Sequence, residues 1–153
     1  MVGALAYDLI IGIGLCLVGI LIVGSEISVS IIFLPLILAP VFLIAMGLSW
    51  FFSALGVFVR DVGQLGSFLG LALLYSSGVF YSAEKVQKTA PLIWNFLQWN
   101  PLLQIIDSIR EVVLWQGNPN WGSIAYAWCF GILMLFLGSW FFNRLKPAFA
   151  DIL

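Results

Sequence analysis

The sequence predicts an all-α membrane protein, a bundle of four transmembrane helices with a re-entrant pair of short helices before the last span. Of the 153 residues, 63% are apolar and 8% are charged. Soluble domains carry about 25% charged and about 45–50% apolar residues, so there is too little polar surface here to cover a water-soluble globule. The charged residues also divide the chain into long uncharged runs. Composition and charge spacing therefore both indicate a lipid environment.

The four predicted spans follow these uncharged runs. They cover approximately residues 5–25, 35–58, 63–82 and 121–143. Each is near the ~20 residues that cross a hydrocarbon core of ~30 Å. Pro35 suits the first turn of the second span, where a missing N–H has no partner to lose. Pro40 falls one turn later and is expected to kink that helix.

Charge gives a weak prediction of orientation. Three basic residues lie between the third and fourth spans and three at the opposite face; these are Lys85, Lys88 and Arg110, then Arg60, Arg144 and Lys146. Arg144 and Lys146 flank a span directly, whereas Arg110 lies in a long loop, where the positive-inside rule is weaker. Four crossings place both termini on one side, and we expect that side to be the cytoplasm.

The segment between the third and fourth spans is too apolar for a plain loop. We expect short helices at approximately 91–98 and 101–116, the second with Asn100 as its cap and Pro101 at its first position. The second helix is roughly 22 Å long at 1.5 Å per residue, too short to cross the bilayer. Four tryptophans in this region favour the membrane–water boundary. We therefore predict a re-entrant pair, which in turn implies a pathway, because irregular backbone at membrane depth needs protein or a water-filled cavity around it.

Several of these stretches carry a family resemblance. They are residues 47–61 (GLSWFFSALGVFVRD), 99–102 (WNPL), Arg110 and 149–153 (FADIL). In this order and spacing they resemble the ABC-2 family, and within it the permeases that export O-antigen, capsular polysaccharide or teichoic acid. The likeness is densest over residues 35–153, and the whole of 1–153 is interpreted as part of an ABC-2 type transmembrane domain.

The resemblance implies a six-span transport subunit in the bacterial inner membrane, with cytoplasmic termini. It implies a homodimer, a separate ATP-binding ABC subunit under each copy, and a lipid-linked polysaccharide as substrate. It also implies re-entrant helices on the outer side of the membrane. The four spans here would match the family's last four, so we expect the chain to cover the C-terminal two-thirds of such a subunit, without its first two spans and coupling helix.

Other functions are disfavoured to different degrees. The chain has no GxxxxGK[ST] loop, so a partner must bind the nucleotide. It has no histidine, the most common general base and metal ligand, so we expect no catalytic residue, metal or cofactor. The net charge of −1 gives no attraction to nucleic acid. An ABC-2 exporter of a drug or lipid is the main alternative. A membrane-embedded lipid-modifying enzyme is less favoured, because it would need a carboxylate cluster at one membrane face.

The candidate pathway and gate residues each have a plainer reading. Arg60 and Asp61 end a span, either as an interfacial stop or, by the resemblance, at the cytoplasmic mouth. Asn100 and Pro101 open the second short helix. Asp107, Arg110 and Glu111 form a polar stripe on this helix. Asp107 and Arg110 can pair at i, i+3, while the stripe as a whole could hydrogen-bond sugar hydroxyls or pack an outer gate.

The third predicted span also carries a row of small residues. Gly66 and Gly70 form a GxxxG pattern within it, extended by Gly63 and Ser77. Small residues let two helix backbones approach closely. GxxxG is frequent by chance in apolar helices, so we read this row as packing evidence at most.

Overall fold

The computed structural model of the chain describes residues 29–59, 61–115 and 117–147, with a few positions between 7 and 18. In chain order the elements are η1 (Val29–Phe33), α2 (Leu34–Phe58), α3 (Val62–Ser76), α4 (Ala83–Thr89), α5 (Pro91–Leu97), α6 (Pro101–Val113) and α7 (Trp121–Leu145). The described residues contain no strand, which confirms the all-helical prediction. Most of the predicted span 5–25 lies outside them, as do Arg60 and residues 149–153.

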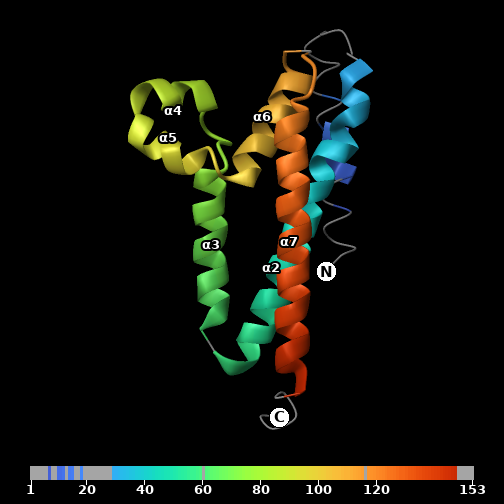
Figure 1. Ribbon diagram of the computed structural model, residues 1–153, viewed down its shortest axis with the longest axis vertical. Coiled ribbons are helices and arrows are strands. Elements are labelled where there is room, and N and C mark those ends of the chain that lie inside the picture. The colour runs from blue at the N-terminus through green and yellow to red at the C-terminus, as the bar shows by residue number, and fades with distance from the viewer. Residues whose placement is uncertain are drawn as a thin grey trace.

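Helices α2 and α7 are the long elements of the fold. Each has 25 residues, and both are long and apolar enough to cross a membrane. They lie side by side and run in the same direction, away from the end at which α6 lies (Figure 1). At 1.5 Å per residue each extends about 37 Å, more than a hydrocarbon core of ~30 Å. The four-span count stays a prediction, because two helices meet this criterion in the described part of the chain.

Glycines bring the backbones of α2 and α7 together along a line that we call the seam, formed by Gly47, Gly131 and Gly138. A Cβ atom added at Gly138 would collide with the backbone of Gly47, and one added at Gly47 would collide with the backbone of Met134. At Gly131 a Cβ atom would lie 3.1 Å from the carbonyl oxygen of Pro40. Close approach through small residues is a common way for helices to associate in membranes. The proline inside α2 is thus buried against α7.

Helix α3 differs from its predicted span, because it ends at Ser76 and not near residue 82. The chain turns over residues 77–80, where Gly78 has a φ of +77°. This left-handed conformation favours glycine, and a Cβ atom here would also collide with the side chain of Leu103. Val62 is the buried residue of α3, while Gly63, Gly66 and Gly70 have open space beside them.

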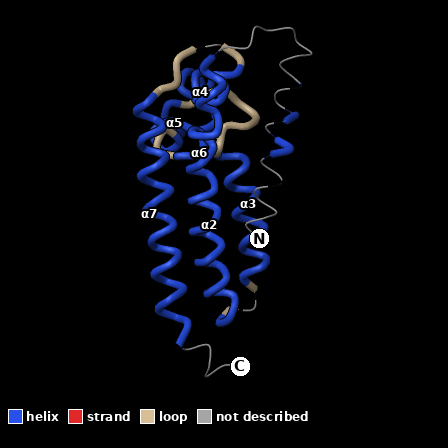
Figure 2. Tube along the Cα trace, turned by 90° about the vertical axis from the view of Figure 1, so that its right-hand side faces the viewer, coloured by secondary structure: helices blue, strands red, loops and turns tan. Residues whose placement is uncertain are grey.

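Three short helices gather at one end of α2, α3 and α7, and we call this the capped end (Figure 2). Helix α6 is anchored there by an apolar cluster shared with α2 and α7, made of Ile37, Ile105, Val112, Ile124 and Ala127. Helices α5 and α6 begin at the predicted prolines, Pro91 and Pro101. Helix α4 was not predicted. Its seven residues are mostly polar and show no apolar periodicity. Ser82 at the N-cap, Glu84 in the first turn and Lys88 in the last turn are nevertheless recognised helix signals.

Candidate functional site

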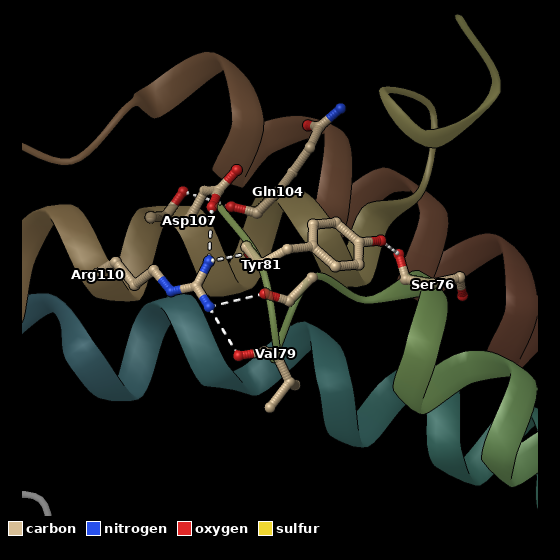
Figure 3. Close-up of polar contacts among 8 residues, drawn as sticks. Ser76, Val79, Tyr81, Gln104, Asp107 and Arg110 are labelled. Atoms are coloured by element: carbon tan, nitrogen blue, oxygen red, sulfur yellow. Dashed lines mark hydrogen bonds and ion pairs between the residues drawn. The ribbon is translucent and has the colours of Figure 1, made fainter. Parts of the chain in front are cut away.

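Arg110 of α6 is the centre of a polar network at the capped end. Its Nη1 donates to the carbonyl oxygen of Tyr81 at 2.8 Å, and its Nη2 donates to those of Gly78 at 2.7 Å and Val79 at 2.9 Å. Figure 3 shows this guanidinium reaching from α6 to the turn that follows α3. The turn leaves carbonyl groups without helical partners, and a planar guanidinium can serve several of them at once. Arg110 therefore fixes the end of α3 to α6.

Asn100 makes a second tie between the same two helices. Its Oδ1 accepts from the backbone N–H of Leu102 at 3.0 Å, so it caps α6 as predicted. Its Nδ2 donates to the carbonyl oxygen of Ser76 at 3.0 Å and to the hydroxyl of the same residue at 3.1 Å. Tyr81 adds a hydrogen bond from its hydroxyl to the Ser76 carbonyl at 3.3 Å. One amide side chain thus starts α6 and holds the last turn of α3.

Asp107 lies one helical turn before Arg110 and pairs with it. The Nη1 of Arg110 is 3.3 Å from Oδ1 of Asp107, which confirms the predicted i, i+3 pair. Burial raises the pKa of the Asp107 carboxyl above its usual value, and the charge and hydrogen bond of Arg110 oppose that rise. Desolvation disfavours the charged form of a carboxyl, while a nearby cation favours it. The nearby charge of Glu111 raises the pKa further.

A cavity of about 640 Å³ lies on the side of α6 that faces the start of α7, and we call it the groove. Its aromatic lining comes from Trp94, Trp99 and Tyr126. Its polar lining includes Gln98, Gln104, Asp107, Glu111, Asn120 and Ser123. The Tyr126 hydroxyl donates to the carbonyl oxygen of Trp99 at 2.7 Å, which ties α7 to the loop between α5 and α6. Aromatic walls with a few placed polar groups are typical of small-molecule sites.

The polar stripe predicted on α6 thus divides between two roles. Asp107 and Glu111 line the groove, whereas Arg110 points its donors at the turn after α3. Pro101 is buried at the first position of α6. Asp61 lies exposed before α3, at the other end of the bundle, so the seven candidate residues do not form one site. Arg60 lies outside the described residues.

The sequence does not predict the groove as a site. Its tryptophans predict interfacial anchors, and the predicted site residues include neither Tyr126 nor Asn120. Asn120 caps α7 by accepting from the N–H groups of Gly122 and Ser123 at 3.1 and 3.3 Å, and an Asn two residues before Gly-Ser is a usable signal for such a cap. Nothing in the sequence shows that α7 starts opposite α6. In the described part of the chain, no group of three or more His, Cys, Asp or Glu side chains is placed to hold a metal ion.

Comparison with known proteins adds a family assignment to this geometry. Residues 1–114 match the family model described as ABC-2 type transporter. Two curated relatives from Klebsiella pneumoniae, both named O-antigen export system permease protein RfbA, are 29% and 28% identical to this chain over 120 residues. The match covers 78% of this chain and 45% of each relative, so the chain spans less than half of their length. No solved structure matches the chain significantly.

Proposed function

The chain belongs to the ABC-2 type transporter family, and we propose that it is part of the permease subunit that exports a lipid-linked surface polysaccharide across a bacterial inner membrane. The family match carries the transport assignment, because it covers residues 1–114. The names of the two relatives support an O-antigen or a related glycan as the cargo. In this proposal a separate ABC subunit hydrolyses ATP, and this chain provides the conduit.

We place the capped end at the outer face of the membrane. Arg144 and Lys146 lie at the opposite end of α7, and exposed basic residues beside a span favour the cytoplasmic side. The guanidinium of Arg144 also lies 5.4 Å from the ring centre of Trp140, an arrangement suited to a membrane boundary. At the capped end, Arg110 counts little toward orientation, since its donors are engaged within the protein, and the exposed Lys85 and Lys88 belong to α4 and do not directly flank α7. The end of α7 then lies at the cytoplasmic face, and we propose the same side for the N-terminus, on the premise that the predicted span 5–25 crosses the membrane.

With this orientation, we propose that α5 and α6 at the capped end enter the outer leaflet and return to the outer face. Helices α5 and α6 have 7 and 13 residues, so neither can cross the bilayer. Exposed apolar side chains of α5, such as Leu92 and Phe96, would lie in the outer leaflet. In this arrangement Asn100, Pro101, Asp107, Arg110 and Glu111 belong to the outer gate, with Arg110 and Asn100 as positioning residues.

A second copy of the chain is the partner that we propose for α3. Phe68 and Tyr75 of this helix are 70% and 64% exposed, and its glycines have open space beside them. At 3.6 residues per turn the glycines share one face of α3, and Phe68 and Tyr75 lie on the opposite face. The face of small residues suits close packing against another helix. At the far end of α3, Asp61 with Arg60 would lie at the cytoplasmic mouth, close to the ATP-hydrolysing subunit.

The test is to purify the full-length subunit with its ABC partner, reconstitute both in liposomes, and measure ATP hydrolysis. The proposal expects stimulation by lipid-linked glycan above that given by the same lipid carrier without sugars. Equal stimulation by the bare carrier would contradict a glycan substrate and favour lipid export. A complex that hydrolyses ATP but responds to neither would contradict both assignments.

Export of a lipid or a drug is the second candidate, and one cavity favours it. A cavity of about 590 Å³ between α3, α4 and α5 has a mostly apolar lining that includes Tyr75, Val86, Ile93 and Leu97. Such a lining suits a hydrocarbon chain more than a sugar. The bare-carrier measurement above separates this candidate from glycan export.

A further inference from the structure

The ionisable groups that line the groove are of one sign. Asp107 and Glu111 contribute carboxylates to its wall, and no lysine or arginine is among the residues that line it. This follows from the fold and not from composition, because the chain has 6 basic and 7 acidic residues. The nearest basic side chain in sequence, Arg110, lies between the two carboxylates on α6.

Arg110 leaves the groove negative because its guanidinium is engaged elsewhere. Its Nη2 donates to the carbonyls of Gly78 and Val79, on the side of α6 that faces the turn after α3. Its ion pair reaches Oδ1 of Asp107 at 3.3 Å. Glu111 has no ion-pair partner among the residues that the structure describes. The groove therefore keeps at least one uncompensated carboxylate.

The aromatic side chains of the groove, like its carboxylates, favour a cationic ligand over an anionic one. The faces of Trp94, Trp99 and Tyr126 carry negative charge density, which attracts a cation and repels an anion. Trp99 is 66% exposed, so its ring is open to a ligand. The side-chain amides of Gln98 and Gln104 and the hydroxyl of Ser123 add neutral polar groups to the lining, which suit sugar hydroxyls.

We propose that the groove is a saccharide subsite that admits neutral or amino-bearing sugars and rejects sugars that carry carboxylate or phosphate groups. This inference rests on the proposed function, since it concerns the glycan that passes the outer gate. The aromatic rings and amides recognise a sugar of either kind. The uncompensated Glu111 then selects by charge, because bringing like charges together at a binding surface is costly.

The experiment measures binding of three soluble hexasaccharides to the full-length subunit with its ABC partner in lipid nanodiscs. The probes are N-acetylchitohexaose, which is neutral, chitohexaose, which is cationic, and hexagalacturonate, which is anionic. We expect hexagalacturonate to bind about tenfold more weakly than the neutral probe, and chitohexaose at least as tightly. Glu111→Gln should reduce the difference in affinity between hexagalacturonate and the neutral probe. Glu111→Lys should make hexagalacturonate the tighter ligand of the two. Glu84→Gln, on the exposed face of α4, is the matched control and should change nothing.

Two results would overturn the inference in different ways. Equal binding of all three probes, unaffected by Glu111→Lys, would show that the groove takes sugars without charge selection. Failure of every probe to bind would show that the groove is not a saccharide subsite. Neither result decides the proposed function, which depends on whether lipid-linked glycan stimulates ATP hydrolysis.

Discussion

Helices α7 and α3 both contact α2, but they are held in opposite ways. Along the seam, Gly47 and Gly138 let α7 approach α2 so closely that neither position has room for a Cβ atom. Helix α3 stands apart from α2 over most of its length (Figure 1), and it is tied at the capped end by Asn100 and Arg110. Helices α2 and α7 thus pack directly against each other, whereas α3 is held by polar contacts at its C-terminal end.

This difference shows that a row of small residues does not identify its own partner. The GxxxG pattern of α3 is the stronger sequence signal, yet a Cβ atom added at Gly66 or Gly70 would meet nothing among the described residues. Gly47 and Gly138 carry no such pattern, and there the backbones of α2 and α7 leave no room for a Cβ atom. A small residue permits close approach, but which helices meet depends on the rest of the fold.

Gly138→Leu should produce the largest effect, because it places a side chain against the backbone of α2. We expect the seam to open at a cost of more than about 3 kcal/mol, since a backbone cannot move aside as a flexible side chain can. Thermal unfolding in detergent, followed by circular dichroism, measures the loss. The matched control is Gly56→Leu in α2, which has open space and should be neutral or slightly stabilising, because leucine favours helix more than glycine does. Equal losses in the two variants would contradict the close approach of α2 and α7 at the seam.

Arg110→Ala should have the next largest effect, because it removes the donor for the carbonyls of Gly78, Val79 and Tyr81. We expect a cost of about 3 kcal/mol, since three hydrogen bonds from a charged group are lost at once. Hydrogen exchange should rise at the end of α3 and not along the seam. Arg110→Lys should restore little, because an ammonium group lacks the planar fork. Arg144→Ala, at the other end of the bundle, is the control and should cost less than about 1 kcal/mol. Uniform exchange along α2, α3 and α7 in Arg110→Ala would argue against a local tie.

Asn100→Ala should cost less, about 1–2 kcal/mol, because it removes the cap of α6 and the tie to Ser76. Asn100→Asp separates these two roles. It keeps an oxygen for the N–H of Leu102 but replaces the Nδ2 donor by a carboxylate oxygen facing the Ser76 carbonyl, so at least about half of the loss should remain. Chemical denaturation of the three proteins in the same detergent gives the comparison. If Asn100→Asp is as stable as wild type, the contact with Ser76 contributes nothing.

The sequence predicts the helices well where a local signal exists. Composition predicts the membrane environment, and prolines and caps place the starts of α5 and α6 correctly. The predicted end of α3 is wrong because an uncharged run does not reveal the turn at Gly78, to which Arg110 hydrogen-bonds from 32 residues away. The groove was missed for the same reason. Its walls come from α5, α6 and α7, and only their packing shows that Glu111 and Tyr126 line one cavity.

Labelling of single cysteines tests most directly the claim that the capped end faces outward. With Cys16 and Cys129 replaced by serine, Glu111→Cys and Asn143→Cys report on opposite ends of the bundle. We expect a membrane-impermeant maleimide to label Glu111→Cys in intact cells, and to label Asn143→Cys only after the membrane is permeabilised. Labelling of Asn143→Cys in intact cells, with Glu111→Cys protected until permeabilisation, would contradict both the orientation and the outer gate.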